Sequence, residues 1–161
     1  FAFAFSLALT LFIVATGTVA ASVDSLPTEP LYNVKLLAER TELFFSPAEK
    51  RPTLHAAYSL SRLMEIETLG SRGVVVSSTL NNFSLETGAA IKSAYLLPYS
   101  QQTNLLLAIV SITATQEQVL SQIQLTMPIA KTLQQEIARA QLDSQQHRLD
   151  ALTLIATLTG Q

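Results

Sequence analysis

Few side chains in this sequence could support catalysis or bind a metal, and they lie far apart. The two histidines, His55 and His147, each stand alone, and neither has a carboxylate at the spacing of a metal-binding His-Glu-x-x-His helix. The chain has no cysteine, which excludes disulfides, thiolate metal ligands and a cysteine nucleophile. We therefore expect neither a metal nor a cofactor.

The acidic residues form no pair suited to general acid and base catalysis. Glu65 and Glu67 are two residues apart, which would place them on different faces of a helix. Glu39 and Glu42 flank Arg40, and solvated or ion-paired surface carboxylates are the ordinary explanation for all four. The sequence also lacks a glycine-rich phosphate loop and a serine elbow motif. We predict that the protein is not an enzyme.

The composition separates this chain from nucleic-acid-binding proteins and from ordinary soluble domains. Charged residues make up 14% of the chain, against roughly 25% in soluble domains. The net charge is −2 and the basic residues are scattered, whereas a phosphate-binding surface needs clustered lysines and arginines. We expect no nucleic-acid partner. The shortage of charge indicates a membrane segment, extensive burial against other proteins, or both.

The first residues have the properties of a membrane anchor. From Phe1 to Val23 there is no charged residue, and the first is Asp24. As a helix this segment would be roughly 34 Å long, enough to cross a hydrocarbon core of about 30 Å. A secretory signal peptide cleaved near residues 19–21 is the rival interpretation, and we favour the anchor. Because Phe1 already lies inside the apolar run, we also expect a segment before it.

The residues after the predicted anchor indicate its orientation. Asp24 and Glu29 follow it, and no lysine or arginine occurs before Lys35. By the positive-inside rule, residues 24–161 would lie outside the cytoplasm, on the periplasmic or cell-surface side. The expected protein is single-pass, with a cytoplasmic N-terminus and with residues 1–23 in the lipid bilayer.

Hydrophobic periodicity predicts helices along the rest of the chain. Apolar residues recur at three- and four-residue spacing, and prolines or glycines separate the runs. Residues 74–76 have strand propensity, but no partner strand is visible. We therefore predict an all-α protein in which a transmembrane helix precedes a bundle of about five helices. Their expected ranges are about 29–45, 47–69, 76–98, 99–127 and 129–158.

Local signals predict where the first two of these helices begin. Thr28 is placed to cap the first one. Residues 46–49, Ser-Pro-Ala-Glu, have the pattern of a capping box for the second. Pro52 lies a turn further on and should kink or restart that helix, because proline removes an interior hydrogen bond.

The last two predicted helices would form a long antiparallel hairpin, joined at Pro128. Between Lys92 and Lys131 the only charged residue is Glu117. A central position in the bundle would explain this, and so would a face docked against another protein, where charge is costly to desolvate. For the docked face, outside the internal seam, the candidate partner-binding residues are Leu106, Val110, Gln118 and Gln122.

A family resemblance covers residues 26–73 and continues more loosely to residue 98. The stretch has a Pro-x-x-Pro-Leu-Tyr-x-Val-Lys opening, then Glu-Arg, a Ser-Pro helix start and a Leu-His pair followed by Arg-Leu. The residues at these places are Pro27, Pro30, Leu31, Tyr32, Val34, Lys35, Glu39, Arg40, Ser46, Pro47, Leu54, His55, Arg62 and Leu63. The order resembles the uncharacterised helical extracytoplasmic domain that follows the transmembrane helix of bacterial anti-sigma-factor-like membrane proteins.

This resemblance implies an extracytoplasmic helical domain at residues 24–98, without catalytic residues. The hairpin predicted at residues 99–161 has no counterpart in the family. Pro52 departs from the family, which has a helix former there. A cytoplasmic sigma-binding module is not among the residues of this sequence. Sigma regulation is therefore not carried over by the resemblance.

The junction after the anchor is the last candidate site. We expect Pro27, Pro30, Tyr32 and Lys35 to fix how the bundle sits on the membrane, because two prolines leave no flexible linker. The predicted function is a non-catalytic, membrane-anchored interaction domain, most simply an accessory or structural subunit that binds other membrane proteins in a larger assembly. The alternative is the extracytoplasmic sensor part of an anti-sigma-factor-like signalling protein.

Overall fold

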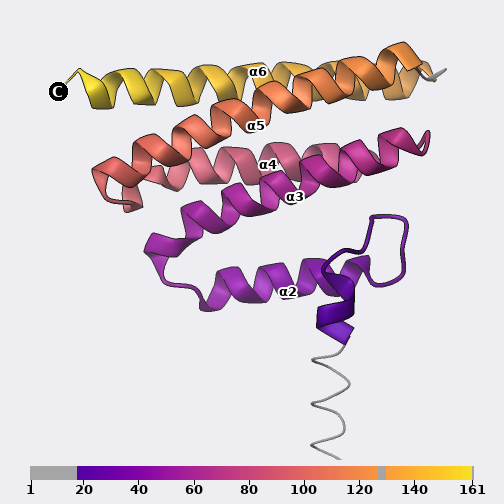
Figure 1. Ribbon diagram of the computed structural model, residues 1–161, viewed down its shortest axis with the longest axis horizontal. Helices are drawn as coiled ribbons and strands as arrows, with labels where there is room; N and C mark the ends of the chain where they lie inside the picture. Colours follow the sequence, from indigo (N-terminus) through magenta and orange to yellow (C-terminus); the bar gives the residue numbers. More distant parts are fainter. Residues whose placement is uncertain (1–17, 127–129, 161) are drawn as a thin grey trace, which may run out of the picture. The chain divides into compact units, whose positions relative to one another are not determined.

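The structure is a computed structural model that describes residues 18–126 and 130–160 (Figure 1). Within these ranges every regular element is helical and no β-strand forms, which confirms the all-α prediction. The chain divides into two compact units, Phe1–Phe45 and Ser46–Gln161. The predicted boundary between residues 98 and 99 lies inside the second unit.

The described part of the first unit is a short helical stretch, a series of turns and one longer helix. Residues 18–22 are helical, and α2 spans Tyr32–Phe45. Before α2, the backbone N–H of Leu26 donates to Glu29 Oε2 at 2.9 Å. The predicted start of the helix after a Thr28 cap is wrong, because the residues up to α2 form turns instead.

The second unit begins with a 3-10 turn, η1 (Ala48–Lys50), followed by α3 (Arg51–Ser71). Pro52 lies in the first turn of α3, where its missing N–H costs no helical hydrogen bond. The predicted restart at this proline is therefore confirmed. The predicted capping box at residues 46–49 is wrong, because η1 has Pro47 at its N-cap and no side chain caps it.

A Schellman motif ends α3 at Gly73. The φ angle of this glycine is +74°, a conformation that residues with a Cβ seldom adopt. The N–H of Val74 donates to the carbonyl of Leu69 at 2.9 Å, and the N–H of Gly73 donates to that of Gly70 at 3.0 Å. Val74 is thus part of the helix cap, which accounts for the missing strand at residues 74–76.

Three further helices complete the second unit. They are α4 (Ser77–Ser93), which continues into the 3-10 turn η2 (Ala94–Leu96), α5 (Tyr99–Thr126) and α6 (Lys131–Thr159). Successive helices run in opposite directions, so α3 is parallel to α5 and α4 is parallel to α6 (Figure 1).

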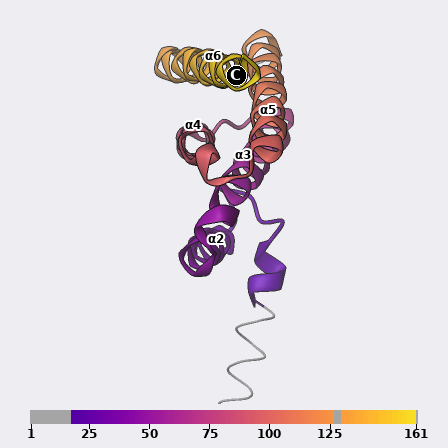
Figure 2. The ribbon, with the colours of Figure 1, turned by 90° about the vertical axis from the view of Figure 1, so that its left-hand side faces the viewer.

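The four helices α3 to α6 form two stacked hairpins. The helices α3 and α4 pack on each other, as do α5 and α6, and the two hairpins meet through the pairs α3–α5 and α4–α6. Figure 2 shows this arrangement along the helices, with α3 and α6 at opposite corners. The predicted C-terminal hairpin therefore packs on the helices before it and does not extend away from them.

The core consists of two apolar clusters at successive levels of the bundle. Cluster one contains Ala56, Ala90, Ile91, Ala94, Leu97, Leu105, Leu106, Ile109 and Ala151. Cluster two contains Leu63, Ile66, Leu80, Phe83, Leu120, Ile123, Ile137 and Ala140.

A buried polar layer lies between these clusters. Its members, which come from all four helices, are Ser59, Thr87, Thr113, Gln116 and Ser144. The hydroxyls of Ser59 and Thr87 hydrogen-bond to each other at 2.7 Å, and Ser144 Oγ donates to Gln116 Oε1. Each hairpin thus has a buried polar tie near its middle, and both of these ties join residues 28 positions apart.

Candidate functional site

The outer face of α5 is exposed and uncharged. Glu117 is the only charged residue of this helix, and its Oε1 lies 3.0 Å from Nη1 of Arg148 on α6. Leu107 and Leu125 are 51% and 83% exposed. Other exposed residues along this face are Asn104, Ala108, Ser111, Thr115, Gln118 and Gln122.

Burial inside the bundle does not explain this lack of charge. α5 occupies a corner of the two-hairpin stack and contacts α6 on one side and α3 on the other. The two contacts bury two stripes of the helix, which consist of Leu105, Ile109, Gln116 and Ile123, and of Leu106, Thr113 and Leu120. Most of the other α5 residues are exposed, and a few, such as Val110, Ile112 and Val119, are partly buried. The exposed residues favour the docked-face explanation over that of a central helix.

Of the four predicted partner-binding residues, two lie on this face. Gln118 and Gln122 are exposed, and Val110 is partly buried against cluster one. Leu106 is only 1% exposed, so its predicted place outside the seam is wrong. The prediction assumed one internal seam along this helix, whereas a helix with two neighbours buries a second stripe.

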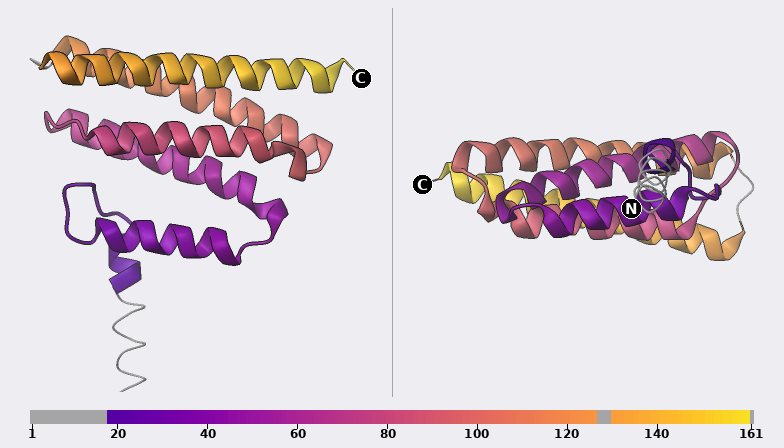
Figure 3. Two further views of the ribbon diagram at one scale, coloured as in Figure 1. Left: turned by 180° about the vertical axis from the view of Figure 1, so that it is seen from behind. Right: turned by 90° about the horizontal axis from the view of Figure 1, so that it is seen from below.

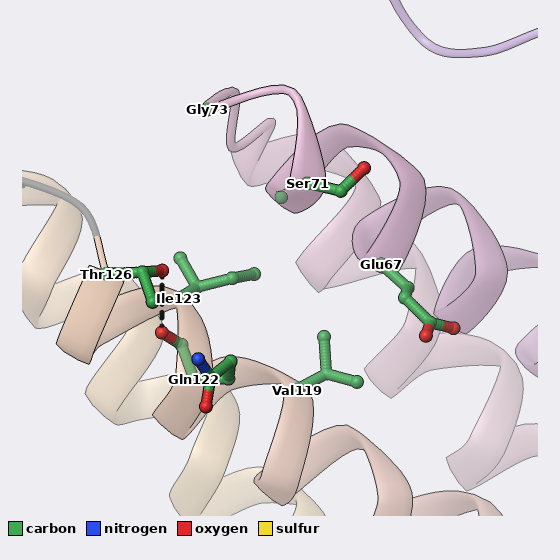
Figure 4. Close-up of a pocket in the computed structure, with 8 residues that line it drawn as sticks. Glu67, Ser71, Gly73, Val119, Gln122, Ile123 and Thr126 are labelled. Atoms are coloured by element: carbon green, nitrogen blue, oxygen red, sulfur yellow. Dashed lines mark hydrogen bonds between the residues drawn. The ribbon is translucent and has the colours of Figure 1, made fainter.

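A hollow of about 520 Å³ opens beside this face, between the C-terminal ends of α3 and α5 (Figure 4). Val119 and Ile123 form its apolar wall, and Glu67 and Gln122 lie at its polar rim. At the α5 side, Thr126 Oγ1 donates to the carbonyl of Gln122 at 2.8 Å. The hollow therefore joins apolar and hydrogen-bonding groups next to a predicted partner-binding residue.

Gly70 lets α3 approach α5 closely at this hollow. A Cβ at this position would lie 2.6 Å from Ile123 Cδ1, closer than such atoms can pack. The sequence interpretation treated Gly70 only as a helix-end signal, although it lies inside α3. A glycine within a helical pattern is the signal that would have indicated a close helix contact.

The residues of the predicted junction belong to the first unit. Tyr32 and Lys35 are 7% and 8% exposed, Pro27 is partly buried and Pro30 is exposed. Most of the predicted anchor, residues 1–17, lies outside the described residues. In the part of the chain that the structure describes, no helix has the length and apolar character needed to span a membrane. The role of the junction stays a prediction.

The potentially reactive side chains do not converge. His55 Nδ1 lies 2.6 Å from Glu86 Oε2, and Glu65 pairs with Arg62 one turn away on α3. His147 lies on α6, where burial lowers its pKa. Across residues 18–126 and 130–160, no group of three or more acidic, histidine or cysteine side chains is placed to hold a metal ion.

Comparison with known proteins assigns no function to this chain. No family model, curated protein or solved structure matches this chain. The resemblance of residues 26–73 to the anti-sigma-associated domain stays a prediction. The exposed face of α5 and the adjoining hollow are the features on which a function can be argued.

Proposed function

We propose that this protein is a non-catalytic interaction domain that serves as an accessory or structural subunit of a membrane protein complex. The observation that carries this proposal is the exposed, uncharged face of α5. Charged residues are depleted in the cores of protein interfaces because their desolvation is costly. A 28-residue helix with a single, ion-paired carboxylate fits such an interface.

The hollow beside α5 gives the proposed interface a specific docking point. Apolar anchors that fill pockets near the centre of an interface contribute most of the binding energy in many complexes. Val119 and Ile123 would contact such an anchor, and Gln122 would hydrogen-bond at its edge. An uncharged or weakly polar side chain of a partner helix matches this lining.

The location of the domain is part of the same proposal. Residues 1–23 contain no charge and supply the anchor in the bilayer, with the N-terminus in the cytoplasm. Residues 24–161 then lie on the periplasmic or cell-surface side of a bacterial membrane, where other membrane proteins are the partners. The resemblance of residues 26–73 supports this setting, because the family's domain also follows a membrane helix.

A charge placed on the α5 face tests the proposal. Gln122→Lys should release the partner subunits, because an unpaired charge in an interface costs several kcal/mol, and about 1.4 kcal/mol is tenfold in affinity. The matched control is Gln135→Lys, the same change at an exposed position of α6. Each variant is purified from its own membranes in mild detergent, and the stoichiometry of co-purifying proteins is measured by quantitative mass spectrometry.

Three outcomes separate the possible functions. Loss of integral membrane proteins from the Gln122 variant alone supports the proposal. Equal recovery from both variants, with unchanged circular dichroism, contradicts a role for the α5 face. Recovery of a cytoplasmic regulator in place of membrane subunits would favour the sensor function that the resemblance implies.

A further inference from the structure

The contact between α4 and α6, here called the polar seam, includes two polar pairs in strict register. Ser77 Oγ donates to Glu136 Oε2, and Ser84 Oγ donates to Asp143 Oδ2 at 3.3 Å. In both pairs the residues are 59 positions apart, as expected for two parallel helices that rise together. Figure 3 shows the two helices running side by side when the bundle is seen from behind.

One turn beyond Ser84 and Asp143, the same register brings His147 onto Gly88. A Cβ at position 88 would lie 3.2 Å from His147 Nε2 and 3.8 Å from Cε1, so the ring rests almost directly on the backbone of α4. His147 Nδ1 is buried and has no hydrogen-bond partner among the described residues. The glycine thus creates a recess in which the imidazole ring packs as a neutral group.

The charged groups around this ring come from both helices. Burial is the largest influence and lowers the pKa of His147 from its ordinary value of 6.5. Asp143 and Asp150 on α6 raise the pKa, while Lys92 on α4 lowers it further. The carboxylates do not compensate for the desolvation of the ring, so the packed state favours the neutral imidazole.

A hollow beside the recess also gives a protonated ring space to move. It has a volume of about 320 Å³ and borders His147, Gly88, Lys92 and the exposed Asp150. A protonated imidazole carries an N–H donor on Nδ1, which finds no acceptor in the recess and would have to reach water. Leaving the recess removes one of the contacts that hold α4 and α6 together.

We propose that the α4–α6 seam is an acid-sensitive latch, in which uptake of a proton by His147 loosens its packing on Gly88 and favours separation of α6 from α4. The sign follows from linkage: the open seam binds the proton more tightly than the closed seam does. The stability of the seam is therefore complete above pH 6.5. It decreases as the pH falls from there toward the lowered pKa of the packed ring.

Hydrogen exchange on the full-length chain in mild detergent tests the latch. We expect amides of α4 and α6 to exchange faster at pH 5.5 than at pH 7.5, after correction for the intrinsic rate. The increase is at most about tenfold for each unit by which packing lowers the pKa. Amides at the α3–α5 contact, around Gly70 and Ile123, should change less.

Two variants assign the effect to one histidine. His147→Gln should abolish the acid-induced exchange, and the matched control His55→Gln should retain it, because His55 lies outside this seam and pairs with Glu86. Acid-induced exchange that persists in His147→Gln would overturn the proposal.

A direct titration keeps the proposal testable if His147→Gln does not fold. The ring protons of His147, followed by NMR in the otherwise unaltered chain, should titrate below pH 6.5. Lys92→Gln should raise that midpoint, because it removes a cation that disfavours the protonated ring. A midpoint at or above 6.5 in the unaltered chain contradicts the latch.

Discussion

The two seams between parallel helices both depend on a glycine that receives a large side chain, but the chemical character of that side chain differs. In each, a glycine of one hairpin receives a large side chain of the other: Gly70 faces Ile123 in the α3–α5 seam, and Gly88 faces His147 in the α4–α6 seam. The first side chain is apolar and buried beside a hollow, whereas the second can take up a proton. A close helix contact can thus be permanent or conditional, depending on the side chain that the glycine receives.

The largest effect should come from filling the apolar seam. Gly70→Ala places a methyl group 2.6 Å from Ile123 Cδ1. We expect the free energy of unfolding to fall by about 1–3 kcal/mol, because overpacking outweighs the gain in helix propensity. Urea denaturation measures this change. Adding Ile123→Val should restore part of the lost stability. A Gly70→Ala protein as stable as the original would show that the α3–α5 seam has room for a methyl group.

A smaller effect is expected from filling the polar seam. In Gly88→Ala the new methyl group lies 3.2 Å from His147 Nε2, and the ring can shift into the adjoining hollow. Alanine gains about 1 kcal/mol of helix propensity, so the stability at pH 7.5 should stay within about 1 kcal/mol of the original. Thermal unfolding of both glycine variants side by side gives the comparison. A loss as large as that of Gly70→Ala would mean that the ring cannot move.

The smallest effect on stability should follow from removing one hydrogen bond of the polar seam. Ser84→Ala deletes a partly buried hydrogen bond of 3.3 Å to Asp143. A long, partly solvated bond contributes little, so we expect a loss of no more than about 1 kcal/mol in urea denaturation. Ser111→Ala, at an exposed serine of α5, is the matched control. A clearly larger loss of stability in Ser84→Ala would show that the serine–carboxylate hydrogen bonds, and not the His147 contact, hold α4 to α6.

Helix positions were largely predictable because strong local signals mark them. Pro98 and Pro128 flank the long apolar pattern of α5, and the predicted range of 99–127 agrees with Tyr99–Thr126. Pro52 likewise indicated the start of α3. At Thr28 the local signal failed, since a Glu29 side chain closes a turn there in place of a helix.

The candidate sites were less predictable because they depend on contacts between distant segments. Leu106 was misplaced, since a one-stripe pattern does not show how many neighbours a helix has. No sequence pattern indicates that Gly88 and His147 meet, because the two residues are connected only by the register of parallel helices. The uncharged character of α5 was visible in the sequence, but its exposure was not.

The stacking of the two hairpins also determines how the second unit would come apart. Each hairpin has its own polar tie, between residues 28 positions apart, and touches the other through equivalent helices. Stability in such an array is approximately the sum of the stability of each repeat and of the interface between neighbours, as in helical solenoids. A destabilising substitution confined to α6 should therefore unfold the C-terminal hairpin first and leave α3 and α4 paired. Unfolding would then proceed one hairpin at a time.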